Sequence, residues 1–425
     1  MEKILIKNGR MVDPANGIDG KKDILIENGK VKEVADRIVA DKDTKEIDAE
    51  GKAVMPGFID LHVHLREPGF EYKETIETGS KAAARGGVTS ICPMPNTKPV
   101  IDSAESVRDL LKRAKNSPVH ILPIGACTIG QEGKELADIE GMKKAGIIAL
   151  SEDGKSVMDS ALFRKALKEA ARLELPMFSH CEDKALVEGG VMNAGKKSEE
   201  LGLPGITNSV EDVIVARDII MSKEVGNRLH LCHCSTADSV VLVEMAKKQG
   251  LPVSAEVCPH HFTMSDDEIT EDHGRFKMNP PLRSRADVDA LKEGLKAGVM
   301  GVISTDHAPH GKEEKDQSML KAPFGIVGLE TSFALGYTEL VDKGVLTLSQ
   351  LVEKMSVNPA KVLGIDKGNL AEGKVADIVI ADITQEYNID SSKFVSKGKN
   401  TPFDGKAVKG RVIMTFVDGK IVYQE

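Results

Sequence analysis

The 425-residue sequence predicts an α/β protein, a (β/α)8 TIM-type barrel with a small β-sandwich domain formed by both chain termini. Three observations support this fold class. Eight short apolar runs alternate with helix-patterned segments through the middle of the chain, as in a (β/α)8 barrel. Both ends of the chain instead carry short alternating strands separated by turn signals. Histidines and acidic residues follow the apolar runs, at the strand ends where barrel enzymes place their active sites.

Residues 1–53 are predicted to form the N-terminal part of the β domain. Apolar residues alternate with polar ones or cluster in the short runs 4–6, 23–26 and 31–34, with a turn signal at 27–30. The same pattern returns near the other end of the chain, in residues 376–380, 411–417 and 419–423. Because the two ends share this pattern, we expect residues 365–425 to complete the domain that residues 1–53 begin.

Residues 54–364 are predicted to form the catalytic barrel. Its first strand is an apolar run that begins at Val54 and contains Pro56 and Gly57. The other seven predicted strands are 88–92, 120–127, 146–150, 176–179, 228–232, 252–257 and 301–304. Helix-patterned segments lie between them, among them 160–173, 210–223, 237–248 and 286–297.

Two histidines near the end of the first strand indicate a metal site. His62 and His64 are two residues apart, so in a strand both imidazoles point to the same face and reach one metal ion. Arg66 projects to the same side just past the strand end. This stretch therefore predicts a metal beside an anion site. The alternative interpretation is a pair of hydrogen-bonded histidines and a surface arginine.

The remaining strand ends extend this prediction to two metals. Eight of the eleven histidines follow the ends of predicted strands, whereas chance would scatter them; they are His62, His64, His180, His233, His260, His261, His307 and His310. With Asp153 and Asp306, the four histidines His62, His64, His180 and His233 form a candidate two-metal set, because imidazole and carboxylate ligands suit zinc. Asp153 is the candidate bridge. Glu152 is expected to be solvated, and His230, which opens its strand, to lie at the other end of the barrel.

Composition excludes several other classes of protein. The formal net charge is −9 and no block of Lys and Arg is present, which argues against a nucleic-acid-binding protein. No apolar run approaches the ~18 residues of a membrane helix, and the N-terminus lacks a signal-peptide pattern. The six cysteines form no CxxC pair and most lie in apolar runs. We therefore expect a reduced, cytoplasmic enzyme with buried thiols.

Two long segments carry a family resemblance. Residues 62–69 (HVHLREPG) and 304–310 (STDHAPH) resemble the signature segments of class I dihydroorotases, which belong to the metal-dependent amidohydrolase superfamily. The resemblance covers essentially the whole chain, including the closing segment 369–377. Many relatives carry a carbamylated lysine as the metal bridge, whereas this sequence offers Asp153, as class I dihydroorotases do. Lys155 is the only nearby lysine that could take that role instead.

The resemblance implies a set of site residues. One Zn²⁺ would be held by His62, His64 and Asp306 and the other by His180 and His233, with Asp153 bridging the two. Asp306 would be catalytic. Substrate contacts would come from His64, Arg66, Asn96, Asn279, His310, Phe324 and Gly325. The charged stretch that begins at Gly311 would form a solvated loop, and whether residues 311–325 close over the site as a lid stays open.

The resemblance also implies the activity, which is the reversible cyclisation of N-carbamoyl-L-aspartate to L-dihydroorotate in pyrimidine (UMP) biosynthesis. A homodimer is expected, with possible association with aspartate transcarbamoylase. Two alternatives stay open at this point. A hydantoinase or allantoinase would share the metals, but Arg66 and the absent lysine bridge argue against it. A non-catalytic subunit that supports the transcarbamoylase could lose metal ligands, whereas this sequence keeps all six.

Overall fold

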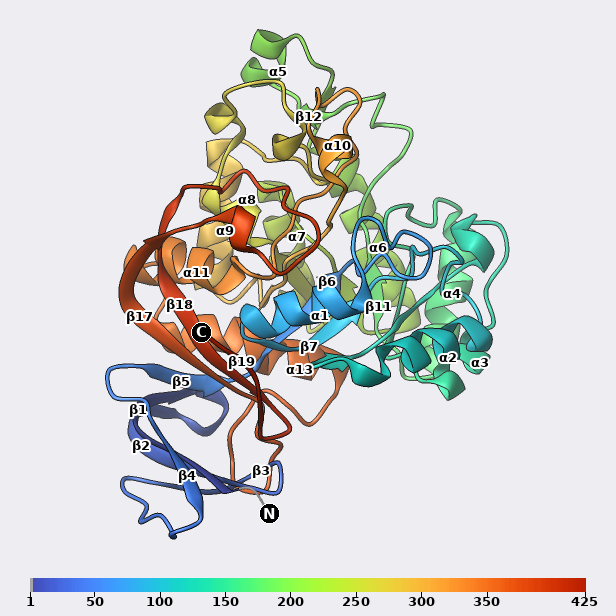
Figure 1. Ribbon diagram of the computed structural model, residues 1–425. Helices are drawn as coiled ribbons and strands as arrows, with labels where there is room; N and C mark the ends of the chain where they lie inside the picture. Colours follow the sequence, from blue (N-terminus) through green and yellow to red (C-terminus); the bar gives the residue numbers. More distant parts are fainter. Residues whose placement is uncertain (1–2) are drawn as a thin grey trace.

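The computed structural model describes residues 3–425 and has a barrel at its centre (Figure 1). The barrel strands are β6 (Phe58–Val63), β7 (Val88–Pro93), β8 (His120–Ile121) with β9 (Ile124–Ala126), β10 (Ala149–Ser151), β11 (Met177–Ser179), β14 (Leu229–Leu231), β15 (Val253–Val257) and β16 (Val302–Ile303). The paired neighbours run parallel. A parallel β-bridge joins Val63, at the end of β6, to His307, just after β16, and so closes the barrel. The predicted (β/α)8 barrel is confirmed.

The third barrel strand is divided, although the sequence predicted one strand over 120–127. β8 pairs with β7, and β9 pairs with β10. Pro123 lies between them and has no N–H to donate to a neighbouring strand. Its carbonyl still accepts a bond from Ile148 N at 2.9 Å, and Leu122 N donates to Ile91 O at 2.9 Å. The chain therefore keeps its place in the barrel across the break.

Helices cover the outside of the barrel. They are α1 (Ile76–Arg85), α2 (Ala104–Arg113), α3 (Ile139–Ala145), α4 (Ser160–Arg172), α6 (Ser209–Val225), α7 (Ala237–Lys248), α9 (Arg285–Lys296), α11 (Ser332–Gly336), α12 (Leu348–Val352) and α13 (Asn358–Leu363). Side-chain caps from Thr75, Ser103 and Asp159 accept backbone N–H groups in the first turns of α1, α2 and α4. Short elements in the connections are α5 (Lys196–Leu201), α8 (Pro259–Thr263), α10 (Lys312–Lys315), β12 (Met192–Asn193) and β13 (Gly205–Ile206).

Both ends of the chain form one sheet, as predicted. Its strands are β1 (Lys3–Asp13), β2 (Ile18–Glu27), β3 (Lys30–Ala35), β4 (Thr44–Asp48), β5 (Ala53–Pro56), β17 (Ile378–Asn388), β18 (Ala407–Val417) and β19 (Lys420–Gln424). The order is β19-β18-β17-β5-β1-β2-β3, with β4 beside β1. Figure 1 shows the blue N-terminal strands continuing into the red C-terminal ones. Ile4, Ile24, Ile378 and Phe416 share one buried cluster in this sheet.

The apolar run that begins at Val54 is two strands rather than the single strand that was predicted. β5 pairs with β1 and β17 in the terminal sheet, and β6 begins the barrel. Gly57 lies between them, and a Cβ there would overlap the side chain of Thr89. This change of sheet cannot be predicted from the hydrophobic pattern, because the residues directly before and after Gly57 are apolar. The domain ranges 1–53, 54–364 and 365–425 stay a prediction.

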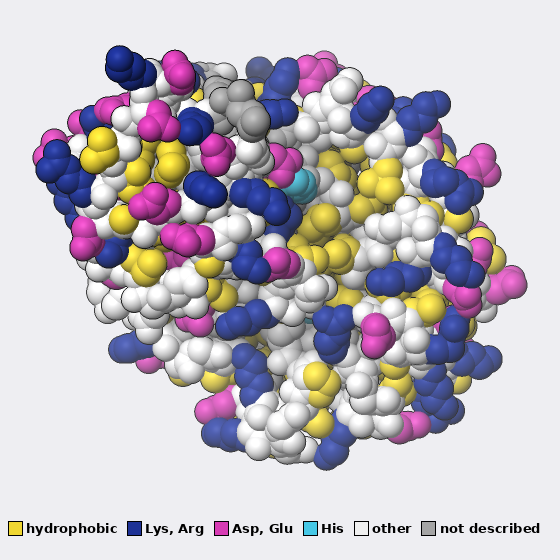
Figure 2. Space-filling model, turned by 90° about the horizontal axis from the view of Figure 1, so that it is seen from below, with side chains coloured by type: hydrophobic (Ala, Val, Ile, Leu, Met, Phe, Trp, Pro, Cys, Tyr) yellow, Lys and Arg dark blue, Asp and Glu magenta, His cyan; other side chains and the backbone are white. Residues whose placement is uncertain are grey.

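The surface and the cysteines agree with the composition. Figure 2 shows Lys and Arg side chains interspersed with Asp and Glu over the face that it presents. All six cysteines are buried and free, as expected. Among residues 3–425, no helix is long and apolar enough to cross a membrane. In Figure 1, α5, β12 and α10 lie together on the opposite side of the molecule from β1–β4.

Candidate metal centre and active site

The six predicted metal ligands converge at the carboxyl ends of the barrel strands. They are His62 and His64 at the end of β6, Asp153 after β10, His180 after β11, His233 after β14 and Asp306 after β16. None of these side chains is well exposed, and His62 is completely buried. Residues separated by more than 240 positions thus meet in one place, because parallel barrel strands end on the same rim.

The cluster consists of two groups of ligand atoms that share Asp153. In the first group, His62 Nε2 lies 3.2 Å from Asp153 Oδ1 and His64 Nε2 lies 3.5 Å from Asp153 Oδ2. Asp306 Oδ1 joins this group at 3.0 Å from His64 Nε2 and 3.6 Å from His62 Nε2. In the second group, His180 Nδ1 and His233 Nε2 lie 3.4 Å and 3.8 Å from Asp153 Oδ1.

The donor atoms fit a bound metal. His62 Nε2 and Asp153 Oδ1 are buried and have no hydrogen-bond partner among the described residues. Buried polar atoms are nearly always paired, so two unpaired atoms that face each other indicate a missing partner. Imidazole nitrogens and carboxylate oxygens are the ligands that zinc and related divalent ions take in proteins. The burial and the chemistry of these ligand atoms therefore fit a metal site.

Charge within the cluster keeps its carboxylates ionised. Burial alone would raise the pKa of Asp306, but the charge of His62 and the hydrogen bond from His64 lower it to about 2. In the same way, His62, His180 and His233 outweigh burial and hold the pKa of Asp153 well below its usual range. Ionised carboxylates are the form that binds a cation or accepts a proton.

Three residues of the site hold an unusual backbone conformation. Arg66, His233 and Asp306 have φ angles of 61°, 35° and 46°. Residues other than glycine rarely adopt this left-handed region, and such strain gathers at functional sites. In each case the strained residue lies just beyond a strand, where the chain turns its side chain toward the barrel mouth.

A buried carboxylate that the sequence did not single out orients the cluster. Glu256 Oε1, on β15, lies 2.9 Å from His62 Nδ1, and its Oε2 lies 2.9 Å from His230 Nε2. His62 Nδ1 is thus occupied, so Nε2 is the nitrogen that faces Asp153. His230 opens its strand as expected but is connected to the site through Glu256. The only signal in the sequence was an acidic residue inside the predicted strand 252–257.

The cluster opens into a cavity that contains most of the predicted substrate contacts. Its lining includes His64, Arg66, Asn96, Asn279, Phe324 and Gly325. His310 lies just behind the lining, with Nε2 at 2.8 Å from Phe324 O and 3.2 Å from Arg66 Nη2. Asn96 also joins the cluster, because its Oδ1 lies 3.0 Å from His64 Nδ1 and its Nδ2 donates to Asp153 Oδ2 at 3.1 Å.

Three further polar residues belong to this region. Glu182 lines the cavity and accepts a hydrogen bond from Asn279 Nδ2. Lys73 Nζ lies 3.1 Å from His310 Nδ1. Glu152, which was expected to be solvated, is instead buried and accepts bonds from Cys127 N and Thr128 N at 3.0 and 3.1 Å, so that expectation is wrong. Its carboxylate fixes the loop after β9, a long-range contact that the sequence does not reveal.

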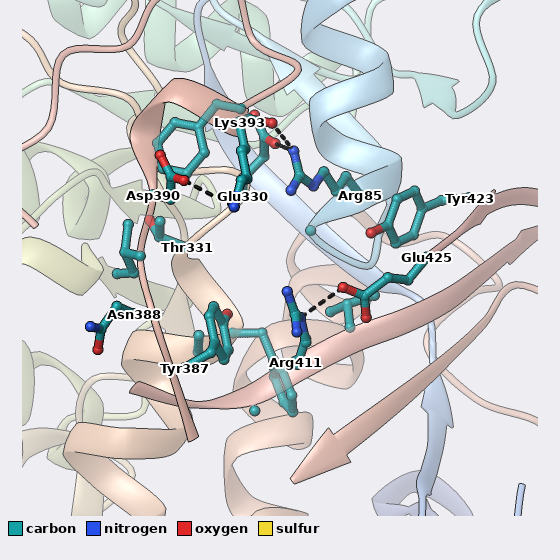
Figure 3. Close-up of a pocket in the computed structure, with 17 residues that line it drawn as sticks. Arg85, Glu330, Thr331, Tyr387, Asn388, Asp390, Lys393, Arg411, Tyr423 and Glu425 are labelled. Carbon is teal, nitrogen blue, oxygen red and sulfur yellow. Dashed lines mark hydrogen bonds and ion pairs between the residues drawn. The ribbon is translucent and has the colours of Figure 1, made fainter. Parts of the chain in front are cut away.

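A second cavity lies away from the cluster, between α1, α11 and the strands β17 and β18 (Figure 3). Its charged side chains are already paired with one another. Arg85 contacts Glu330 at 3.0 Å, Lys393 contacts Asp390 at 3.1 Å and Arg411 contacts Glu425 at 2.8 Å. With no unpaired set of ligand atoms among its described residues, this cavity is the weaker candidate for a catalytic site.

Sequence comparison identifies the relatives. The amidohydrolase family model matches residues 53–422. The dihydroorotase of Syntrophus aciditrophicus is 51% identical over 425 residues, which cover 100% of both chains. The dihydroorotases of Pelotomaculum thermopropionicum and Staphylococcus epidermidis are 50% and 47% identical, over 100% and 99% of this chain and 99% of each relative.

Solved structures share the fold. The L-hydantoinase (dihydropyrimidinase) from Arthrobacter aurescens matches with a TM-score of 0.88 at 28% identity, covering 100% of this chain and 96% of that chain. The dihydropyrimidinase from Brevibacillus agri matches with a TM-score of 0.86 at 25% identity, covering 99% of this chain and 95% of that chain. The fold is thus common to hydantoinases, while the full-length identity near one half is to dihydroorotases. This chain belongs to the dihydroorotases of the amidohydrolase family.

Proposed function

We propose that the enzyme interconverts N-carbamoyl-L-aspartate and L-dihydroorotate, using a pair of zinc ions bridged by Asp153. The observation that carries this proposal is one cavity with two unlike sides. His64, Asp153 and Asp306 of the ligand cluster face it from one side, and the guanidinium of Arg66 faces it from another. Metal-assisted cleavage of an amide needs the ligand side, and binding of a ring that carries a carboxylate needs the guanidinium side.

The cluster divides into two ligand sets. His62, His64 and Asp306 would hold one zinc, His180 and His233 the other, and Asp153 would ligate both. When bound, such ions polarise a carbonyl oxygen and lower the pKa of water toward neutrality. The sharing of Asp153 between the two groups of ligand atoms supports this division.

Asp306 is the proposed proton carrier. In ring opening, its carboxylate accepts the proton of the attacking water and delivers it to the departing ring nitrogen; ring closure runs the same transfers in reverse. Its position in the cavity lining, 3.0 Å from His64 Nε2, supports this role, because it places the carboxylate beside both the ligand cluster and the space for the substrate.

Arg66 is the proposed carboxylate anchor. Its Nε donates to Pro309 O at 3.1 Å and its Nη2 lies 3.2 Å from His310 Nε2, which fixes the guanidinium in the cavity lining. A planar guanidinium binds a carboxylate through two parallel hydrogen bonds. Asn96, Asn279, His310 and the Phe324–Gly325 backbone would complete the pocket. The Glu182 carboxylate accepts the amide N–H of Asn279, so Asn279 Oδ1 would be the atom that accepts a ring N–H.

The homodimer and the association with aspartate transcarbamoylase stay predictions. Another cyclic amidohydrolase activity has support from the fold alone, since the L-hydantoinase and the dihydropyrimidinase compared above share the fold at lower identity.

Metal analysis combined with an L-dihydroorotate hydrolysis assay tests the proposal. The purified protein is expected to hold up to two zinc ions per chain, to lose activity on chelation and to regain it with zinc. Added bicarbonate should change neither metal content nor activity, because an aspartate bridge needs no carbamylation. Lys155→Ala is the matched variant and should keep both metals. Loss of the second metal in Lys155→Ala, with activation of the wild type by bicarbonate, would contradict the Asp153 bridge.

A further inference from the structure

The loop of residues 311–325 contains a buried lysine. Lys315, at the end of α10, is only 3% exposed, whereas Lys312, Glu313 and Asp316 around it are exposed. Lysine is among the residues that proteins bury least. A buried ammonium within an otherwise solvated segment therefore requires an explanation from its contacts.

Lys315 connects two segments that carry proposed substrate contacts. Its Nζ donates to Lys277 O at 2.9 Å and to Pro323 O at 2.8 Å. The first carbonyl lies two residues before Asn279, and the second lies directly before Phe324. Gly325 N also donates to Lys277 O, at 3.0 Å. The backbone beside Asn279 and the backbone of Phe324–Gly325 are thus joined at one point.

Lys277 makes the reciprocal contact. It is 5% exposed, and its Nζ donates to Met319 O, within the loop, at 2.6 Å. The same ammonium lies 4.3 Å from the ring centroid of Phe324, a favourable cation–π distance. Lys315 therefore reaches from the loop to the segment of Asn279, and Lys277 reaches from that segment back to the loop.

These lysines are poorly explained as packing. Among the described residues, neither Lys277 nor Lys315 forms an ion pair with a carboxylate. Burying an ammonium without a counter-charge is costly, and an apolar side chain of similar length would fill the same space more cheaply. What an apolar residue cannot supply is a set of hydrogen bonds to carbonyls of both segments at once.

We propose that Lys315, with Lys277 as its counterpart, is a positioning residue that fixes the Phe324–Gly325 backbone against the segment of Asn279. The 311–325 loop then acts as a fixed wall of the substrate pocket rather than as a mobile lid. The catalytic consequence rests on the proposed function, since it assumes that Phe324, Gly325 and Asn279 contact the substrate. The fixed loop itself does not depend on that assumption.

Hydrogen exchange and steady-state kinetics on Lys315→Met test the proposal in the metal-loaded enzyme. Methionine fills a similar space but donates no hydrogen bond, so Pro323 O loses its bond to Nζ. Amide exchange in 311–325 and 277–279 is expected to accelerate at least tenfold, with the barrel strands unchanged. KM for L-dihydroorotate should rise about tenfold while kcat stays within about twofold, because the lost contacts position the substrate rather than the reacting groups.

Lys312→Met is the matched control, since it removes an exposed lysine from the same short helix. It should behave as the wild type in both measurements. If Lys315→Met does not fold, Lys277→Met is measured in the same way, with faster exchange expected around Met319 and Phe324. Unchanged loop exchange in a folded variant would overturn the fixed wall. Fast exchange of 311–325 in the wild type would show a mobile lid instead. If the wild type is inactive on dihydroorotate but its loop exchanges as expected, the proposed substrate is refuted while the fixed position of the 311–325 loop is supported.

Discussion

The two sides of the active-site cavity are built in different ways. On the ligand side, His62, His180 and His233 come from the ends of barrel strands, and a buried carboxylate, Glu256, fixes His62. On the cationic side, Arg66 and His310 come from loops, and backbone carbonyls hold them, through Pro309 O and Phe324 O. Strand ends position the groups that must be rigid within a fraction of an ångström, whereas loops supply the groups that recognise the substrate.

Electrostatics separates the two sides as well. The ligand side gathers ionised carboxylates, as the low pKa of Asp306 at about 2 shows. On the cationic side, burial together with Arg66, Lys73 and Lys315 lowers the pKa of His310 to about 2, so that imidazole stays neutral. One side thus attracts a metal cation and the other an organic anion. Substitutions on each side test whether a residue belongs to the side where the structure places it.

The largest expected effect is on the ligand side, from Asp306→Asn. An amide oxygen still ligates a metal, but it cannot accept a proton at neutral pH. We expect kcat for dihydroorotate to fall by about 10²–10⁴-fold, the usual range for loss of a general acid–base group, with metal binding at least partly retained. Metal content is measured on the same sample. Near-normal kcat in a metal-replete variant would remove Asp306 from the proton transfer.

On the cationic side, Arg66→Met should lower kcat/KM for dihydroorotate by roughly 2–4 kcal/mol, the scale for breaking a desolvated charge pair. Dihydrouracil lacks the carboxylate, so the wild type should be nearly inert toward it, because an unsatisfied Arg66 disfavours that ring. The variant should lose little of any trace activity on dihydrouracil. Equal losses on both substrates would mean that Arg66 supports the fold or the ligand cluster. Efficient wild-type hydrolysis of dihydrouracil would contradict the substrate assignment.

Glu256→Gln tests a residue that supports the ligand side through His62 without lining the cavity. The change keeps the shape but removes the charge that orients His62, and loss of such a partner commonly costs about 10–100-fold in metal affinity. Competition with a metal chelator measures that affinity directly. Glu211→Gln is the control, because Glu211 is a buried glutamate bonded to Ser235 and Ser239 and makes no contact with the cluster. If both variants weaken metal binding equally, Glu256 acts only through stability.

The ligand side was largely predictable from sequence. His62 and His64 share a strand face by their spacing, and the barrel rule places Asp153, His180, His233 and Asp306 on the same rim. The structure brings these six residues together, while their roles stay predictions. Glu256 escaped notice because it lies within a strand, and nothing local shows that strands β6, β14 and β15 contribute His62, His230 and Glu256 to one network.

The cationic side and the start of the barrel were less predictable. Lys315 reads as part of a charged, solvated stretch, and only its contacts across the fold to Lys277 and Pro323 explain its burial. Gly57 divides an apolar run whose two halves join different sheets, and hydrophobic pattern alone cannot show to which sheet an apolar strand belongs. Local sequence reports periodicity, whereas these features depend on which distant segments meet.

The last prediction concerns the stability of the cationic side rather than its activity. Burial, aided by the nearby Lys277, lowers the pKa of Lys315 from 10.5 to about 7. Between these two pH values the unfolded chain binds a proton that the folded protein does not. The free energy of unfolding contributed by this group therefore decreases as the pH falls from 10.5 to about 7, and changes no further below that.

Lys315→Met lacks this titration, so the stability of the wild type relative to the variant should increase steadily as the pH is raised from 7 to 10. Urea unfolding of both proteins at several pH values in that range measures the difference, and Lys312→Met, an exposed lysine on the same helix, should run parallel to the wild type. Parallel curves for Lys315→Met as well would mean that Lys315 titrates as a solvated lysine. A rising difference would instead show that burial on the cationic side disfavours the charged form of Lys315, whereas the carboxylates on the ligand side are held ionised by their histidine partners.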